Sequence, residues 1–488
     1  MTTLRHHPQI AIVPNPTSMI SQHSALRPVL GLLLAVACTS AGNQQTPPAT
    51  RPAATDDALV ARARAIHQRV MTLDTHVDIN PNQFNPGDSV NFAKGVPGRQ
   101  VDLPKMEAGG YDAVFLAVYQ GQGPLDSAGY ANAYRAAIAK FDAIHKLTEV
   151  LAPDRTGLAL TAADARRINA AGKKVIFAGI ENGYPIGTDL TRVKEFYDRG
   201  GRYMSLAHNG NSQLSDSNTG EQQGYLYNNG LSPLGREVIK LMNTYGMMVD
   251  FSHPSKGAMM EMIKLSKAPI IGSHSGVRAI CNHSRNADDE QLKALAKNGG
   301  VIQLVGFAGY VKCDPKRDSA RTAETAALNR EFGIVLQQGA GRGGGAGRGG
   351  AGGGGGRGAG RGGANAVLDS ILQTLPVERR AEYQRRQQAI AAKYPPTPRA
   401  NVSDFVDHID YAVKLIGIDH VGISSDMDGG GGVDGWNSAA ETFNVTLELV
   451  RRGYTEEQIG KIWSGNLLRV LEECERVAKE IQSGKLKA

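Results

Sequence analysis

Seven histidine and carboxylate side chains stand at or near the ends of short apolar segments that lie far apart in the chain. They are His76, Asp78, Glu181, His208, His253, His274 and Asp426. Neutral imidazoles and carboxylates together suit zinc and related divalent metals. His76 and Asp78 alternate along one predicted strand, so both side chains leave it on the same face and can bind one ion. A single carboxylate can bridge two ions, and Glu181 is the natural candidate.

The alternative for each residue is a purely structural role. A lone histidine at a strand end is more often a hydrogen-bonded polar residue than a metal ligand. Recurrence at the ends of several different strands is hard to explain by packing. Burying so many ionisable groups together would cost on the order of several kcal/mol each unless metals or partners compensated. The pattern therefore predicts a site for two divalent metal ions.

Eight β-rich runs, each separated from the next by loops and helical patterns, must position these residues. The runs are Val70–Ile79, Ala113–Tyr119, Val175–Glu181, Arg202–His208, Met247–His253, Pro269–His274, Val301–Phe307 and His420–Asp426. Near-continuous apolar strands alternating with helices predict a parallel sheet buried on both faces. Eight such units predict an α/β fold, a closed (β/α)8 TIM barrel whose carboxyl-terminal face gathers catalytic groups. An open doubly wound sheet is the alternative, but its usual glycine-rich turn after the first strand is replaced here by His-Val-Asp.

The barrel domain is predicted to span residues 58–488 and to contain one insertion before its last strand. The insertion covers 308–400 and has helical patterns on both sides of a tract over 339–364 that is rich in glycine and arginine. This tract cannot bury enough apolar area to offset the entropy of ordering it, so we expect a disordered loop. It has no aromatic residue on which a nucleic-acid base could stack.

The first 57 residues carry signals for export. Residues 28–37, PVLGLLLAVA, form an apolar run after Arg27 and lead directly to Cys38. This order is typical of a signal peptide over 1–37, and its Ala-Val-Ala-Cys ending resembles a bacterial lipoprotein signal in which Cys38 is lipidated. Simple cleavage after Ala37 is the alternative. The polar residues 38–57 are predicted to be a flexible tether. We therefore expect export to the bacterial periplasm or cell envelope, with membrane attachment only through the lipid.

Charge and cysteine usage exclude several classes of protein. The net charge is +7, but two arginines in the leader and four in the glycine tract account for nearly all of it. A nucleic-acid footprint should lie on the folded body, so no nucleic-acid partner is predicted. The four cysteines form no C-x-x-C pair, which argues against a zinc ribbon or thioredoxin-type motif. Their small number also excludes a disulfide-dense scaffold.

The chain resembles the membrane (renal) dipeptidase family of zinc metallopeptidases from about Leu73 to Leu471. The motifs that carry the resemblance are DTHVD at 74–78, GIENG at 179–183, YMSLAHNGNS at 203–212, DFSHPS at 250–255, SHSGVRAICNHSRN at 273–286, KNGGVI at 297–302, DHIDYAVKLIGIDHVGISSDMDG at 407–429 and WSGNLLRVL at 463–471. The resemblance implies a (β/α)8 barrel, which agrees with the strand count. Three positions depart from the family pattern, at Val77, Asn182 and Gly306, and these bear on substrate choice rather than on the ligands.

The resemblance also implies a role for each site residue. One Zn2+ would be bound by His76, Asp78 and Glu181, and a second by Glu181, His253 and His274. His208 would contact the substrate and stabilise the tetrahedral intermediate. Arg285 would bind the terminal carboxylate, and Asp426 would shuttle the proton. These roles predict hydrolysis of dipeptides by a hydroxide that bridges the two metals, with a small peptide as the substrate; family members tend to form homodimers.

Two other functions are compatible with parts of the pattern. Another metal-dependent barrel hydrolase would cleave lactones, cyclic amides or phosphoesters, but such sites commonly use His-x-His on the first strand and a carboxylated lysine. A surface-tethered binding protein without catalysis is the third possibility, and the intact metal and proton-transfer positions argue against it. Metal analysis coupled to a dipeptide assay separates the three.

Overall fold

The computed structural model describes residues 56–334, 368 and 370–488. The predicted signal peptide over 1–37, the lipidation site Cys38 and the glycine tract over 339–364 lie outside these residues. Nearly all of the predicted tether over 38–57 does too, and the first described helix, α1 (Asp56–Arg69), begins within its last two residues. No helix in the described ranges combines the length and the apolar character that crossing a lipid bilayer requires.

Eight parallel strands form a nearly closed barrel in the order β1-β2-β4-β5-β6-β7-β9-β10. Their bounds are β1 (Leu73–Asp78), β2 (Ala113–Tyr119), β4 (Lys174–Glu181), β5 (Gly201–Ser205), β6 (Met248–Asp250), β7 (Ile271–Val277), β9 (Val301–Val305) and β10 (Val421–Ser424). Two short strands, β3 (Thr156–Leu158) and β8 (Asn286–Ala287), pair with β4 and β7 outside this order. Between β1 and β10, Val77 bridges Met427 in parallel and Asp78 N donates to Met427 O at 3.1 Å. The predicted (β/α)8 barrel is confirmed, and the open sheet is excluded.

The strands are apolar along almost their whole length because both of their faces are covered. All residues of β5, β6, β7, β9 and β10 are buried. Phe115 on β2 and Phe177 on β4 stack with ring centroids 4.4 Å apart. The parallel register of these two strands ends at Tyr119 paired with Glu181, which places both side chains at the carboxyl-terminal edge of the barrel.

The strand ends differ from the predicted runs in four places. His208, His253 and Asp426 lie in the loops just after β5, β6 and β10 rather than in the strands. His274 was predicted to end the sixth run, but it lies in the middle of β7, which continues to Val277. The extension exists because β7 pairs on both sides, with β9 through Ser275 and with β8 through Gly276 and Val277.

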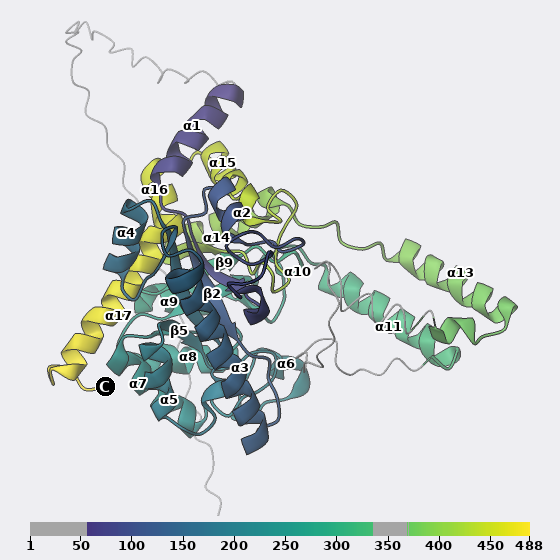
Figure 1. The fold of residues 1–488 in the computed structure, drawn as a ribbon. Helices are drawn as coiled ribbons and strands as arrows, with labels where there is room; N and C mark the ends of the chain where they lie inside the picture. Colours follow the sequence, from purple (N-terminus) through teal and green to yellow (C-terminus); the bar gives the residue numbers. More distant parts are fainter. Residues whose placement is uncertain (1–55, 335–367, 369) are drawn as a thin grey trace, which may run out of the picture. The chain divides into compact units, whose positions relative to one another are not determined.

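Helices surround the barrel, as Figure 1 shows. After α1, their bounds are α2 (Leu103–Ala108), α3 (Ser127–Lys146), α4 (Ala162–Ala170), α5 (Thr191–Asp198), α6 (Gly220–Gln223), α7 (Pro233–Tyr245), α8 (Lys256–Leu265), α9 (Asp289–Asn298), α14 (Val402–Ile416), α15 (Phe443–Arg451), α16 (Glu456–Gly460) and α17 (Asn466–Gln482). A capping box is present at α16, where Thr455 and Gln458 satisfy each other's backbone N–H groups.

The insertion between β9 and β10 contains α10 (Ala308–Val311), α11 (Pro315–Glu331) and α13 (Val377–Lys393). The last two run side by side (Figure 1). They share a small apolar cluster of their own that includes Leu328, Phe332 and Tyr383. An ion pair between Arg386 and Glu331 crosses between the two helices at 2.5 Å. The flanks of the insertion are therefore helical, as the sequence pattern predicts.

Candidate metal centre and substrate site

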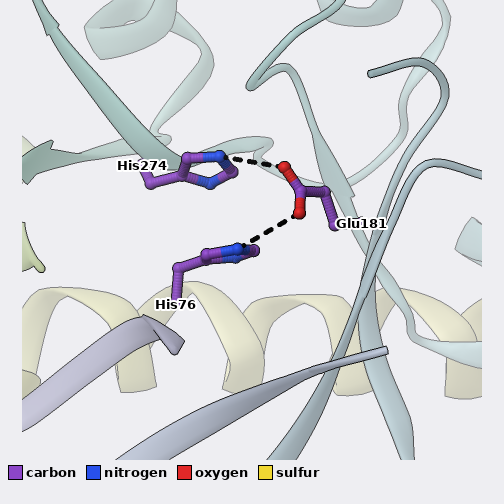
Figure 2. A group of neighbouring side chains, drawn as sticks. All are labelled: His76, Glu181 and His274. Carbon is purple, nitrogen blue, oxygen red and sulfur yellow. Dashed lines mark ion pairs between the residues drawn. The ribbon is translucent and has the colours of Figure 1, made fainter. Parts of the chain in front are cut away.

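The carboxylate of Glu181 lies at the centre of the histidines that the sequence singles out. Its Oε2 atom is 3.2 Å from Nε2 of His76. Its Oε1 atom is 2.8 Å from Nε2 of His253 and 3.3 Å from Nε2 of His274. Figure 2 shows Glu181 presenting one oxygen to each of His76 and His274. One oxygen thus faces the ring nitrogen of His76, and the other faces those of His253 and His274. This is the geometry expected of a bridging ligand.

Three further predicted residues complete the cluster. Asp78 Oδ2 lies 3.9 Å from His76 Nε2, and His208 Nε2 lies 3.6 Å from Glu181 Oε1. Asp426 has a ligand atom within 4.8 Å of atoms of both His76 and Asp78. All seven residues that the sequence singles out for chemistry therefore meet at one end of the barrel.

Hydrogen bonds on the far side of each ring determine which nitrogen faces the centre. The Tyr203 hydroxyl donates its proton to Thr75 O at 3.0 Å, so it accepts from His76 Nδ1 at 2.9 Å. The hydroxyl of Ser273 likewise donates to Asp250 and therefore accepts from His274 Nδ1 at 2.8 Å.

The third histidine follows the same rule. His253 Nδ1 lies 3.2 Å from the amide oxygen of Asn209, which can only accept. Nδ1 of all three rings thus carries a proton, and each Nε2 is the nitrogen that faces the centre. Such fixing of the tautomer by outer hydrogen bonds is what metal-ligating histidines require.

The electrostatics of the centre favour a bound cation. Nε2 of His253 and Nε2 of His274 lie 3.2 Å apart although both present lone pairs. Nε2 of His76 is buried and has no hydrogen-bond partner among the described residues. Burial lowers the pKa of His76, but the charges of Glu181 and Asp78 outweigh it and raise this pKa to about 10. The field therefore favours positive charge at Nε2, where a metal ion would replace the proton. The donor set, the unpaired nitrogen and this field together fit two divalent metal ions.

His208 and Asp426 are suited to proton chemistry. Burial lowers the pKa of His208 to about 4, which keeps its imidazole neutral near pH 7. Burial raises the pKa of Asp426 to about 8; His76 opposes this shift, whereas Asp78 and Glu181 add to it. Asp426 has a φ of 56° and His253 a φ of 80°, conformations that non-glycine residues rarely adopt. Such strain is often found at functional sites.

Arg285 lies in the loop between β7 and β8, beside His274. Its Nη2 donates to His274 O at 3.0 Å, and its Nε and Nη1 are buried without a hydrogen-bond partner in the described ranges. The guanidinium carbon is 5.6 Å from the ring centroid of Tyr310. A buried guanidinium with two unused donors is suited to binding a carboxylate.

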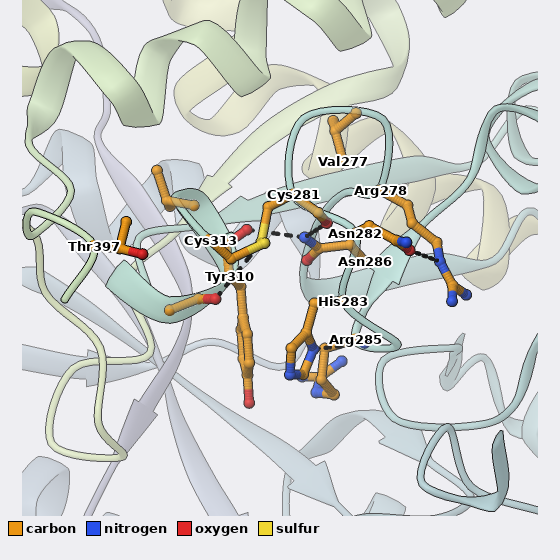
Figure 3. Close-up of a disulfide and its surroundings, with 12 residues drawn as sticks. Val277, Arg278, Cys281, Asn282, His283, Arg285, Asn286, Tyr310, Cys313 and Thr397 are labelled. Carbon is orange, nitrogen blue, oxygen red and sulfur yellow. Dashed lines mark hydrogen bonds between the residues drawn. A yellow bond between two sulfur atoms is a disulfide. The ribbon is translucent and has the colours of Figure 1, made fainter. Parts of the chain in front are cut away.

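A disulfide anchors this loop, as Figure 3 shows. Cys281 is bonded to Cys313, just after α10, and the two Cα atoms are 5.4 Å apart. Asn286 Nδ2 donates to both Cys281 O and Tyr310 O, at 2.8 and 2.9 Å. Arg285 and Tyr310 are therefore held by the same cross-linked segment. Nothing in the sequence reasoning predicted this pairing, since the cysteine spacing alone carries no partner information.

Sequence reasoning also missed the residues that orient the ligands. Tyr203, Asn209 and Ser273 all lie within the quoted motifs, yet only their contacts with the ring nitrogens reveal a role. One sequence feature is connected with Tyr203: the glycine at position 179 on β4 leaves space for its ring. A Cβ added at Gly179 would lie 2.2 Å from atoms of the Tyr203 ring, so any larger residue there would displace the hydroxyl that holds His76.

Comparison with known proteins identifies the same family along nearly the whole described chain. The sequence model described as "Membrane dipeptidase (Peptidase family M19)" matches residues 60–485. The chain is 27% identical over 400 residues to dipeptidase tcpJ of Claviceps purpurea, covering 81% of this chain and 74% of that protein. It is 25% identical over 434 residues to dipeptidase 3 of Rattus norvegicus, covering 87% of this chain and 69% of that protein.

Solved structures give the same result. The probable dipeptidase PvdM of Pseudomonas aeruginosa superposes with a TM-score of 0.66 at 30% identity, covering 86% of this chain and 99% of that one. A metallopeptidase of Rhodobacter sphaeroides, crystallised with a phosphinate mimic of the dipeptide L-Ala-D-Ala, superposes with a TM-score of 0.59 at 19% identity. This second alignment covers 83% of the present chain and 99% of the other, and at that identity it supports the fold alone.

We predict that Tyr203→Phe weakens metal binding, because it keeps the ring but removes the hydroxyl that fixes the His76 tautomer. The affinity for Zn2+ should fall about 10- to 100-fold, measured by titration against a competing chelator. Tyr245→Phe, at the end of the outer helix α7, is the matched control and should bind Zn2+ as the wild type does. Equal affinities in Tyr203→Phe and the wild type would contradict the assigned role.

Proposed function

The chain belongs to the membrane dipeptidase family, peptidase family M19, and from this premise we propose that it is a dipeptidase that uses two zinc ions per chain. Membership makes it a hydrolase that acts on dipeptides. One observation carries the zinc proposal. Glu181 turns one carboxylate oxygen toward Nε2 of His76 and the other toward the Nε2 atoms of His253 and His274. His76 and Asp78 would hold one ion, His253 and His274 the other, and Glu181 would bridge them.

The protein's own residues bind and orient the substrate. Bound zinc ions would supply an activated water and polarise the scissile carbonyl. Arg285 pairs with the terminal carboxylate through a guanidinium donor that no described residue uses, Nε or Nη1. This pairing requires a free carboxylate one residue beyond the scissile bond, which favours a dipeptidase over an endopeptidase.

Two residues act on the reacting atoms. His208 is neutral because burial lowers its pKa to about 4, so an imidazole N–H can donate to the developing oxyanion. Asp426 takes a proton from the attacking water and delivers it to the leaving amine. Burial raises the pKa of the Asp426 carboxyl above its usual value, which favours its acceptance of a proton from the water.

We further propose that the protein is exported and attached to a membrane through lipid on Cys38. The support is the leader sequence, with its apolar run at 28–37 ending at Cys38. The disulfide between Cys281 and Cys313 adds to it, because such bonds persist mainly outside reducing compartments.

We expect the zinc-loaded protein to hydrolyse dipeptides and to leave lactones and phosphoesters intact. Asp426→Asn should retain its zinc, measured by elemental analysis, and lose about 100- to 10,000-fold in kcat because the proton relay is gone. Wild-type protein loaded with zinc that cleaves no dipeptide would refute the proposed function. Undiminished turnover by Asp426→Asn would remove only the proton role.

Arg285→Ala should weaken the use of free-acid dipeptides much more than the use of their C-terminal amides. The expected loss in kcat/KM for the free acids is about 10- to 100-fold, the value of a charge-assisted hydrogen bond. Steady-state kinetics on matched acid and amide pairs measure it. Equal losses for both members of a pair would show that Arg285 does not bind the carboxylate.

Export through a lipoprotein signal predicts a mature chain that begins at Cys38 and carries lipid. Mass spectrometry of the N-terminal peptide from protein made in a bacterial host measures this directly. Cys38→Ser should leave the protein in the soluble fraction. A mature chain that begins at residue 38 without lipid would favour simple cleavage after Ala37 instead.

A further inference from the structure

Lys140, on α3, is a buried cation beside the candidate metal centre. Its side chain is only 12% exposed, and its Nζ atom lies 3.9 Å from Asp78 Oδ1. That separation is too long for a hydrogen bond. None of the described residues accepts a hydrogen bond from Lys140 Nζ. The Nζ atom also lies 5.0 Å from the ring centroid of Tyr119.

Among the described residues, the charge of Lys140 has no carboxylate partner apart from Asp78. The neighbouring cation Arg99 has one, because its Nε lies 3.1 Å from Asp428. Asp78 is the only described carboxylate paired with Lys140, and in the proposed function Asp78 holds a zinc ion. A buried ammonium without hydrogen bonds is costly. An anionic group supplied from outside the chain would compensate it.

Tyr119 offers a second unused donor at the same place. It is the last residue of β2, and its ring lies 4.8 Å from that of His208, measured between centroids. Burial raises the pKa of Tyr119 well above its usual value, so the hydroxyl stays protonated. Within the described ranges, no hydrogen bond engages this hydroxyl. An ammonium and a phenol donor therefore stand together beside His208.

The strand order decides which end of a substrate reaches them. In the circle of eight strands, β2 and β7 stand four positions apart, on opposite sides of the barrel. Arg285 follows β7, and Tyr119 ends β2. A dipeptide whose terminal carboxylate is held by Arg285, and whose scissile bond lies over the Glu181 cluster, must place its N-terminal residue toward β2 and Lys140.

We propose that Lys140 and Tyr119 bind the side-chain carboxylate of an N-terminal aspartate or glutamate, so that the enzyme prefers dipeptides with an acidic first residue. The inference rests on the proposed dipeptidase function and deepens it by naming the substrate class. The carboxylate accepts one hydrogen bond from Nζ of Lys140 and one from the hydroxyl of Tyr119, and it supplies the missing negative charge.

The test compares Glu-Ala with its neutral, nearly isosteric counterpart Gln-Ala on the zinc-loaded protein. Wild type should favour Glu-Ala by about 10-fold or more in kcat/KM, the value of one charge-assisted hydrogen bond. Lys140→Met should abolish this ratio, and Tyr119→Phe should reduce it. Lys146→Met, an exposed lysine on the same helix, should leave it unchanged. Inhibition by phosphinate mimics of Glu-Ala and Gln-Ala should show the same preference in binding.

Two controls separate recognition from a general effect of charge. Zinc content is measured for every variant, because a lysine that only tuned Asp78 would alter metal binding and leave the ratio intact. The pair Ala-Glu and Ala-Gln carries the acid at the other position, and Lys140→Met should not change their ratio.

The outcomes distinguish this inference from the function on which it rests. A wild type that cleaves neutral dipeptides without preferring Glu-Ala overturns the inference and leaves the dipeptidase function standing. A zinc-replete Lys140→Met with the wild-type ratio also overturns it. If Lys140→Met does not fold, the kcat/KM ratio of Glu-Ala to Gln-Ala is compared between the wild type and Tyr119→Phe. An unchanged ratio in Tyr119→Phe then overturns the inference. If no dipeptide is cleaved by the wild type, the proposed function itself fails.

Discussion

A single carboxylate, that of Glu181, sits among the Nε2 atoms of four histidines that come from four different loops and strands, and the barrel edge is arranged around it. Burial would raise the pKa of Glu181, but the neighbouring histidines, His76 foremost, hold it well below its usual value. The carboxylate is therefore ionised in a place where water cannot solvate it. Its charge must be balanced by cations, and the surrounding nitrogens are placed to share them.

This charge balance at Glu181 requires that the surrounding imidazole rings keep a fixed orientation. Each of the three candidate ligand histidines is held at Nδ1 by an acceptor: Tyr203 on β5, Asn209 in the loop after β5, and Ser273 next to His274 on β7. Ser273 is itself held by the buried carboxylate of Asp250, at 2.6 Å. Polar groups thus form a second layer beneath the cluster, and below it the barrel interior is filled by aromatic side chains such as the stacked Phe115 and Phe177.

The loops on the two sides of the cluster differ in structure. On the β7 side, the disulfide and Asn286 fix the loop that carries Arg285. On the β1 and β2 side, Lys140 and Tyr119 leave donors unused. His253 and Asp426 both adopt left-handed backbone conformations. Each such conformation costs about 1–3 kcal/mol. The eight-stranded barrel supplies the stability against which such local costs are small.

Much of this could be read from the sequence, because the relevant signals are local. Apolar runs separated by helical patterns gave the number of strands and the closed barrel, and the motif residues His76, Glu181 and His253 gave the chemistry of the site. The prediction that β7 ends at His274 was wrong, because pairing with β8 and β9 extends it. A local sequence pattern does not predict which distant strands pair with β7.

What the sequence by itself determined is the set of residue types that converge and the architecture that makes convergence possible, since alternation and periodicity are properties of neighbouring residues. Only the tertiary structure decided which nitrogen of each histidine faces Glu181, that Cys281 joins Cys313, and that Lys140 lies beside Asp78 without a hydrogen bond. These features depend on distances between segments tens to hundreds of residues apart. Those distances become fixed only when the barrel closes and its helices pack.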